Sequence, residues 1–351
     1  MRNYKWETLA LIQKHKVFCF FGVGSHFNGV MDYWLEFMPK APHICSDNDP
    51  DKWDNQYRGV FCHPPKTLAG MRKDIVVFIT TRAYKPIQKQ LNEMGVENYV
   101  LPWIDIQNAD YIKNIDTAEM VTQLCSAYAL LGDDKSREVF CTVVERVLGK
   151  NTNVTIMGGV CEPNQYFPKD LITLSDNESF VDCGAYDGDT FVDFTKRTGG
   201  KFNAYYAFEL NQNNYEAFRR NHLDNWLGTG VELHMAGVSD KDENITYADS
   251  SSPATKVGEG TLRGRLVTLD RILENRPVTF IKMDIEGYEA RALEGAKKLI
   301  AEQKPKLAIC VYHRFRDLWE IPLLIKSLNP DYKIYLRHHT NLDCETVCYA
   351  L

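Results

Sequence analysis

The sequence predicts an α/β protein made of two modules, each built on a largely parallel sheet. Three observations support this fold class: strands and helices alternate along the chain, glycine-bearing turns follow two of the strands, and a helical stretch separates the two series. At 351 residues, the chain is long for one domain and comfortable for two. We expect a first module at residues 1–110, a helical linker at 111–164 and a second module at 165–351.

The composition excludes several classes of protein. Apolar residues make up 44% and charged residues 25%, as in soluble globular proteins. A net charge of −6 argues against nucleic acid as the main partner, because phosphate binding needs a basic face. The chain shows neither a secretory signal nor a run of about 18 apolar residues, so we expect no membrane span and a cytoplasmic location. The ten cysteines form no Cys-x-x-Cys pair and are expected as buried free thiols rather than as disulfides or a zinc site. The acids and the histidine of the second module could also bind a divalent metal, but their spacing does not demand one, so no metal site is predicted.

The first module opens with a strand and the glycine-rich turn Gly22-Val-Gly24-Ser-His-Phe-Asn-Gly29. This turn is close to the dinucleotide fingerprint, and Asp47 follows at about the distance of a ribose-binding acid. One interpretation is a nucleotide site, with pyrophosphate at Gly22–Gly24 and ribose at Asp47. The other is a tight turn kept for packing. The strands expected here cover residues 16–21, 43–45, 59–62, 74–80 and 99–101, with a helix at 86–94.

Two helices are expected between the modules, at residues 116–131 and 136–148. Both carry an apolar stripe at helical spacing, and a glycine closes each of them. They are candidates for joining the modules and for carrying a homodimer interface. The aromatic turn Gln165-Tyr166-Phe167-Pro168 then precedes the second module, either as a packing plug or near the mouth of a cofactor site.

The second module is organised around residues 180–191, FVDCGAYDGDTF. We expect a buried strand, a turn from Gly184 to Gly188 and a helix beginning at residue 189 or 190. The glycines let the backbone approach a ligand, and the free N–H groups of the helix face it. The remaining strands are expected at 204–208, 231–235, 278–283, 306–311, 333–336 and 346–350, the last two as a hairpin at the sheet edge.

Polar side chains close four of these strands: Asp182, Glu209, Asp284 and, two residues beyond the fourth, His313. The carboxyl ends of parallel strands lie along one edge of an open sheet, where ligands bind. A carboxylate there must be paired or solvated, so three carboxylates and a histidine at one edge predict a site. Glu209 follows Asp182 by 27 residues, where a ribose-binding acid is needed, which predicts an adenosine-like cofactor.

The acids within the turn indicate which cofactor binds. Carboxylates in the segment from Asp182 to Asp189 would repel a pyrophosphate. S-adenosylmethionine carries a sulfonium and an ammonium beside its ribose, and an acidic turn suits these cations. The sign of the charge therefore favours the methyl donor.

The second module contains, in order, the segments FVDCGAYDGDTF, YAFELNQNNYEAFRRN, VTLDRIL, FIKMDIEGYEARALEGA and YKIYLRHHTNLDCETVCYA. In these it resembles the FkbM family of S-adenosylmethionine-dependent methyltransferases, from Gln165 to Leu351, and IKMDIEGYE is the most diagnostic part. The resemblance implies a class I methyltransferase fold, a Rossmann-like seven-stranded sheet whose last strand is antiparallel. It also implies O-methylation of a small-molecule or glycan acceptor. The first module resembles the Rossmann-like module of some sugar-modifying enzymes, where it can hold a nucleotide-sugar.

The resemblance also implies roles for individual residues. The turn is expected to hold the methionine end, Glu209 the ribose, and Gly237 with Val238 the adenine, although a plain turn also explains the last two. Asp182 either contacts the cofactor or holds the turn. The cofactor-binding residues expected are Asp182, Gly184, Tyr186, Asp187, Gly188, Glu209, Leu210, Gly237, Val238 and Asp284.

Three catalytic residues are expected: Asp284, Glu286 and His313. Asp284 would hold the ammonium of the donor or take the acceptor's proton. Glu286 would orient the acceptor or cap the following helix. His313 would be the general base or a hydrogen-bonded histidine at the cleft wall. The polar segment 247–265 is either a lid or a solvated loop or hairpin.

One alternative function stays open. The Gly22–Gly29 turn would serve an NAD-dependent oxidoreductase or a nucleotide-sugar-binding protein, with a non-catalytic second module. No pair of residues suited to hydride chemistry accompanies that turn in the sequence. Binding of S-adenosylmethionine by one module and of a dinucleotide by the other would separate the two hypotheses.

Overall fold

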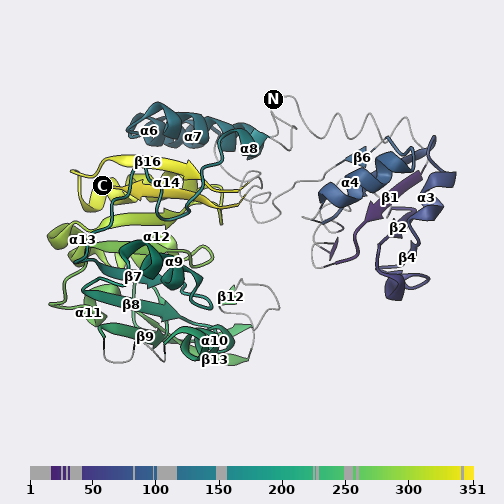
Figure 1. Ribbon diagram of the computed structural model, residues 1–351. Helices are drawn as coiled ribbons and strands as arrows, with labels where there is room; N and C mark the ends of the chain where they lie inside the picture. The colour runs from purple at the N-terminus through teal and green to yellow at the C-terminus, as the bar shows by residue number, and fades with distance from the viewer. Residues whose placement is uncertain are drawn as a thin grey trace. The chain divides into compact units, whose positions relative to one another are not determined.

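The computed structural model describes residues 17–24, 27–28, 31, 42–81, 84–97, 99–100, 117–147, 156–223, 226, 229–248, 256–257, 261–340 and 344–351. The chain divides into two compact units, Met1–Ile115 and Asp116–Leu351 (Figure 1). The boundary lies close to the end of the expected first module, whereas the helices expected as a linker belong to the second unit.

The first unit is built on a six-stranded sheet in the order β3-β4-β2-β1-β5-β6. All its strand pairs are parallel except β3 with β4. Apolar strands pack Phe20, Cys45, Cys62 and Phe78 into one core. The strands are β1 Val17–Phe21, β2 Ile44–Ser46, β3 Gln56–Tyr57, β4 Val60–His63, β5 Ile75–Ile79 and β6 Tyr99–Val100, and the helices are η1 Pro50–Lys52, α3 Lys66–Gly70 and α4 Tyr84–Glu93.

The second unit contains a seven-stranded sheet in the order β16-β17-β15-β14-β7-β8-β9 (Figure 1). Strand β17 runs antiparallel to both β15 and β16, and the other pairs are parallel, which confirms the expected fold class. The strands are β7 Ser179–Cys183, β8 Ala204–Glu209, β9 Val231–Met235, β14 Phe280–Met283, β15 Lys306–Cys310, β16 Ile334–His338 and β17 Thr346–Ala350. The helices are α6 Thr117–Ala129, α7 Asp134–Val147, α8 Ile156–Gly159, α9 Asp189–Thr198, α10 Gln212–His222, α11 Leu269–Ile272, α12 Glu289–Glu294, α13 Lys297–Gln303 and α14 Asp317–Leu328.

Aromatic side chains form the core beneath the central strands. The ring of Phe180 on β7 stacks on Tyr205 at 5.2 Å and meets Phe280 at 4.9 Å and Phe194 at 5.0 Å, between ring centroids. Because β7 is fully buried on both faces, its sequence is apolar apart from Ser179 and Asp182. This core holds rigid the strand from which the glycine-bearing turn emerges.

A small four-stranded sheet follows β9, in the order β10-β13-β11-β12. It is built from β10 Gly237–Val238, β11 Glu243–Ala248, β12 Lys256–Val257 and β13 Leu262–Val267. Strands β11 and β13 pair antiparallel, so much of the segment 247–265, expected as a lid or as a loop or hairpin, belongs to an ordered sheet. Residues 249–255 and 258–260 of that segment lie outside the described residues.

Helices α6 and α7 pack on the second unit, α6 against α14 and α7 against β16 (Figure 1). A buried arginine anchors this contact. Arg337 on β16 is 2% exposed, and its Nη2 lies 2.7 Å from Asp133 Oδ2 and 2.8 Å from Asp170 Oδ2. The hydroxyl of Ser136 accepts from Arg337 Nη1 at 3.0 Å and from the backbone N–H of Leu336 at 2.9 Å. The start of α7 is thereby fixed to the edge of the sheet.

We predict that Asp133→Asn weakens this anchor by about 1–2 kcal/mol of unfolding free energy at pH 7. Burial alone would raise the pKa of Asp133, but hydrogen bonds from Arg337 and Ser136 lower it to about 2. Since the folded-state pKa is depressed, this stabilisation is present above the unfolded pKa of about 3.9 and is lost as the pH falls through about 2.

Urea unfolding of the variant and the wild type, followed from pH 7 down to pH 2, measures the effect. The difference between the two proteins should shrink below about pH 4. Asp134→Asn is the matched control, because the exposed Asp134 pairs only with Arg137 on its own helix. A difference that stays constant with pH would contradict the assignment.

Candidate functional site

Two glycines shape the turn that follows β7. Gly184 has a φ of +81°, and a Cβ there would lie 1.9 Å from the backbone oxygen of Asp284. Gly188 has a φ of +95° and precedes α9, and a Cβ there would lie 2.6 Å from the Phe218 ring on α10. Both positions therefore need glycine, the first because the ends of β7 and β14 nearly touch. Between them, Tyr186 is exposed with a φ of +48°, and Asp187 is half-buried.

Asp182 lies inside the sheet. It is fully buried, and its Oδ1 lies 2.9 Å from the Nζ of Lys282, its partner across the β7–β14 pair. The hydroxyl of Tyr205 donates to Asp182 Oδ2 at 2.5 Å, and Lys282 donates to the backbone oxygen of Gly184 at 2.6 Å. Burial alone would lower the pKa of Lys282, but Asp182 raises it, so the lysine is charged. This geometry favours the second of the two expected roles, in which Asp182 holds the turn.

Glu209, at the end of β8, ties the turn to the next loop. Its Oε2 accepts from the backbone N–H of Tyr186 at 2.9 Å, and its Oε1 from that of Asn211 at 2.7 Å. Burial raises the pKa of Glu209 while these hydrogen bonds oppose the rise. The carboxylate thus lies at the carboxyl edge beside the glycine-bearing turn, as expected for this residue.

Leu210, Gly237 and Val238 form an apolar group beyond Glu209. A Cβ on Gly237 would lie 2.7 Å from Leu266 and 3.6 Å from Leu210. Val238 is buried on β10, which pairs with β13. The structure therefore brings these three residues together, next to the loop that Glu209 begins.

Asp284 ends β14 and accepts hydrogen bonds from two tyrosines. The hydroxyl of Tyr166 donates to its Oδ2 at 2.7 Å, and that of Tyr312 to its Oδ1 at 3.0 Å. Tyr166 comes from the aromatic turn before the second unit's sheet and lies 118 positions away in the sequence. Burial alone would raise the pKa of Asp284, but the nearby His313 and Lys282 lower it, so this carboxylate is ionised.

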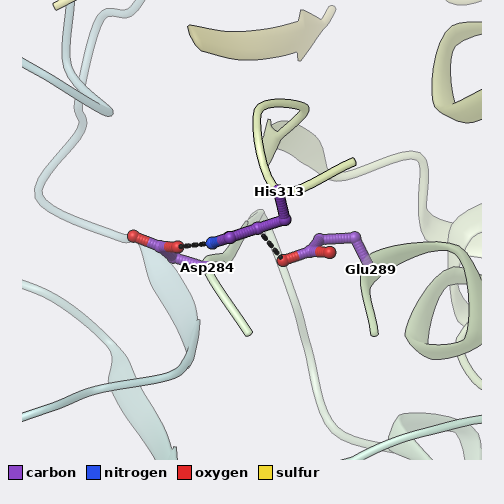
Figure 2. A group of neighbouring side chains, drawn as sticks. All are labelled: Asp284, Glu289 and His313. Atoms are coloured by element: carbon purple, nitrogen blue, oxygen red, sulfur yellow. Dashed lines mark ion pairs between the residues drawn. The ribbon is translucent and has the colours of Figure 1, made fainter. Parts of the chain in front are cut away.

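His313 is surrounded by three carboxylates. Its Nε2 lies 3.3 Å from Asp284 Oδ1 and 3.4 Å from Glu286 Oε2, and its Nδ1 lies 3.0 Å from Glu289 Oε1. Figure 2 shows the ring standing between Asp284 and Glu289. Burial alone would lower the pKa of His313, but the carboxylates raise it to about 10. With no other cation bound, the ring is an imidazolium at neutral pH, and this state disfavours the predicted role as general base.

Glu289 was not foreseen from the sequence. It is fully buried in the first turn of α12, where its Oε1 also accepts from the backbone N–H of Ile285 at 2.9 Å. This side chain therefore closes the turn between β14 and α12. Its position in the diagnostic IKMDIEGYE segment was the available signal. Lys282 and Tyr312 were also missed, since only the folded sheet brings them to the acids.

In the first unit, Asp47 is engaged by its own turn. Its Oδ2 accepts from the backbone N–H of Val23 at 2.6 Å and lies 3.1 Å from Lys52 Nζ, and its Oδ1 accepts from Asp49 N at 3.0 Å. Gly22 has a φ of +110° and supports the tight turn. These hydrogen bonds and the ion pair with Lys52 account for the position of Asp47 without a ligand. Gly29 lies outside the described residues.

Comparisons with known proteins identify the fold. A methyltransferase FkbM from Methylobacillus flagellatus KT has a crystal structure that matches with a TM-score of 0.75 at 23% identity, covering 99% of this chain and 94% of that one. A putative rRNA-methylase from Clostridium thermocellum (11% identity, 58% and 93% covered) and a putative methyltransferase from Streptococcus mutans in complex with SAH (14%, 56% and 93%) match with TM-scores of only 0.33 and 0.29. No curated protein is similar enough to match the chain.

The seven-stranded sheet with its antiparallel β17 is the class I methyltransferase fold. Residues 182–340, within the second unit, match the family model described as the methyltransferase FkbM domain. The protein is therefore a methyltransferase, and its cofactor is S-adenosylmethionine.

We predict that Gly184→Ala disrupts the turn, because its Cβ would lie 1.9 Å from the Asp284 oxygen. The expected cost is at least about 3 kcal/mol of unfolding free energy, measured by urea denaturation. Gly199→Ala is the matched control: its φ is +61°, but no atom lies within 4 Å of the added Cβ. That control should cost only about 1–2 kcal/mol of backbone strain. Equal stability of the two variants would refute the close approach of β7 and β14.

Proposed function

We propose that the second unit transfers the methyl group of S-adenosylmethionine to a hydroxyl oxygen of a sugar, a glycan or a related small molecule. The observation that carries the proposal is the Asp284 carboxylate, whose two oxygens each accept a tyrosine hydroxyl. Because Asp284 accepts hydrogen bonds from hydroxyl groups at this edge of the sheet, the edge suits an acceptor that carries several hydroxyls. Tyrosine rings beside carboxylates are also the side chains that fit a sugar, one contacting its apolar face and the other its hydroxyls.

The cofactor is proposed to lie across the ends of β7, β8 and β14. The turn residues Gly184, Tyr186, Asp187 and Gly188 would surround the methionine part, and Glu209 and Leu210 the ribose. Gly237 and Val238 would border the adenine. A carboxylate offers about four lone-pair positions, so Glu209 can accept ribose hydroxyls while keeping its two backbone hydrogen bonds. The acids at this edge match the sulfonium and ammonium of the donor.

The reaction is proposed to be an in-line displacement. A lone pair of the acceptor oxygen forms a bond to the methyl carbon as the carbon–sulfur bond breaks, and S-adenosylhomocysteine leaves. The oxygen becomes positively charged as it is methylated, which makes its proton strongly acidic. A carboxylate is then a sufficient base, so no neutral histidine is needed. The protein mainly supplies alignment and a site from which water is excluded.

Asp284 and Glu286 are the proposed catalytic carboxylates. Asp284 is held by Tyr166 and Tyr312 and would receive the acceptor's hydrogen bond. The side chain of Glu286 is 35% exposed, so it can orient the acceptor and pass the released proton to solvent. Where no metal ion is bound, the imidazolium of His313 would balance the negative charge of the carboxylates around it.

We predict that Glu209→Gln weakens the binding of S-adenosylhomocysteine about 10- to 100-fold, because charge-assisted hydrogen bonds to the ribose are lost. Isothermal titration calorimetry with the full chain measures this effect, and circular dichroism confirms the fold. Glu216→Gln on α10 is the control, since Glu216 pairs only with Arg219 at the surface. Unchanged affinity would remove Glu209 from the cofactor site, and no binding by the wild type would overturn the proposed function.

A nucleotide-sugar at the first unit is a second proposal, favoured by one observation. The strand order reverses between β1 and β5, and no atom of the described residues lies within 4 Å of a Cβ added to Gly24, which follows β1. Calorimetry with uridine diphosphate sugars tests this idea, and Gly24→Val should abolish binding without unfolding the chain. Binding of NAD instead would support the oxidoreductase alternative, and binding of neither would leave the turn a packing feature.

The location and the oligomeric state of the enzyme are also proposed here. Within the described segments, no helix is both long and apolar enough to cross a membrane. We propose a cytoplasmic enzyme that forms a homodimer through α6, where Val121 is 50% exposed and Tyr128 is 38% exposed. Light scattering coupled to size-exclusion chromatography should give the mass of a dimer, and Val121→Glu should reduce it to that of a monomer. A monomeric wild type would refute the dimer.

A further inference from the structure

The imidazole of His313 is buried among carboxylates, and its Nε2 makes no well-formed hydrogen bond. Its side chain is 6% exposed, and Nε2 is not aligned for hydrogen bonding with either of the two acids beside it. A buried polar atom of this kind calls for a further partner, such as a bound ion. The acids around it point to a cation as that partner.

We propose that His313 Nε2 binds a divalent metal ion together with the carboxylates of Asp284 and Glu286, and that Glu289 orients the ring from its other side. Asp284, Glu289 and His313 offer potential ligand atoms that all lie within 4.8 Å of one another. Figure 2 shows the ring between Asp284 and Glu289, so one ion cannot contact both ring nitrogens. The Nε2 side, which faces two carboxylates, is therefore the side for the ion.

The distances on this side suit metal ligands better than hydrogen-bond partners. Nε2 lies 3.3 Å from Asp284 Oδ1 and 3.4 Å from Glu286 Oε2. Hydrogen bonds between nitrogen and oxygen span about 2.7–3.2 Å. Two ligand atoms that each lie about 2.1 Å from one ion, at angles between octahedral and tetrahedral, are about 3.0–3.4 Å apart. An ion therefore fits beside Nε2 after only a small adjustment of the exposed end of Glu286.

Glu289 supplies the orientation that a metal-binding histidine needs. Its Oε1 lies 3.0 Å from His313 Nδ1, and it is held in place by the backbone N–H of Ile285. A carboxylate on the second ring nitrogen selects the tautomer whose Nε2 lone pair faces the ion, and it makes that nitrogen a better ligand. Because Glu289 is fully buried, it is fixed in this role.

The backbone after β14 directs both carboxylates to the same side of the ring. Glu286 has a φ of +56° and Gly287 a φ of +92°, so two consecutive residues adopt the left-handed conformation. This left-handed turn sets the direction in which the Glu286 side chain leaves the backbone. The partly exposed side chain of Glu286 also gives the ion a route in from solvent.

The ligand set of two carboxylates and one imidazole suits Mg²⁺ or Mn²⁺, which keep several coordination positions for water or substrate. An acceptor hydroxyl in one of those positions would lose its proton more easily and would be held in line with the methyl group. This last step rests on the proposed function, since it assumes a hydroxyl acceptor. Binding of the ion itself does not depend on that assumption.

Titration of the chelator-treated full chain with Mn²⁺, followed by electron paramagnetic resonance of the free ion, tests the site. The wild type should bind one ion per chain that Mg²⁺ displaces. His313→Gln and Glu286→Gln should each lower the affinity at least tenfold. Glu289→Gln should lower it about 10- to 100-fold, as expected for a residue that acts through a ligand.

His234→Gln is the matched control, because His234 Nε2 also lies 3.4 Å from a carboxylate, that of Glu232, but faces only this one acid. It should bind Mn²⁺ like the wild type. Circular dichroism verifies that each variant is folded. Absence of saturable Mn²⁺ binding by the wild type, or equal binding by folded His313→Gln, would overturn the proposal. Calorimetry with S-adenosylhomocysteine on the same samples tests the proposed function separately.

Discussion

The buried ion pair between Asp182 and Lys282 is the interaction on which the working edge of the sheet depends. It joins β7 to β14 at the register where both strands end. Lys282 also holds the backbone oxygen of Gly184, and the glycine in turn leaves room for the oxygen of Asp284. A charged pair in a dry interior demands close geometry, because any separation leaves an uncompensated charge. The glycine-bearing turn and the end of β14 are therefore positioned by one interaction.

The carboxyl edge of the sheet is strongly acidic, and its carboxylates differ in the partners that balance their charge. Asp182 is neutralised inside the sheet by Lys282, and Glu209 is satisfied by backbone N–H groups of the turn and the loop. Asp284, Glu286 and Glu289 all lie beside the imidazole of His313. Three carboxylates thus gather around His313, where the positively charged donor and the acceptor are proposed to meet.

The succession of strands along the chain and the residues at their ends follow from local patterns. An apolar run that stops at an acid or a glycine marks the end of a parallel strand, so the sequence alone predicts that Glu209 and Asp284 lie at one edge. The partners of those acids were not predictable in this way. Tyr166 reaches Asp284 across 118 positions, and Lys282 meets Asp182 only once β7 and β14 are neighbours. The protonation of His313 likewise depends on Glu289, whose inward orientation no periodicity indicated.

The outer strands of the seven-stranded sheet have a consequence for solubility. At β16, the chain covers the exposed backbone: Gly132 N–H donates to the oxygen of Ile334 at 2.8 Å, and Glu162 N–H to that of His338 at 2.7 Å. The edge strand β9 carries the charged side chain of Glu232 and the polar side chain of His234, and Arg276 pairs with Glu232. Unpaired strand edges invite other chains to add to a sheet and to aggregate. Helix α7 and the segments beside it therefore also protect the enzyme from self-association through its sheet.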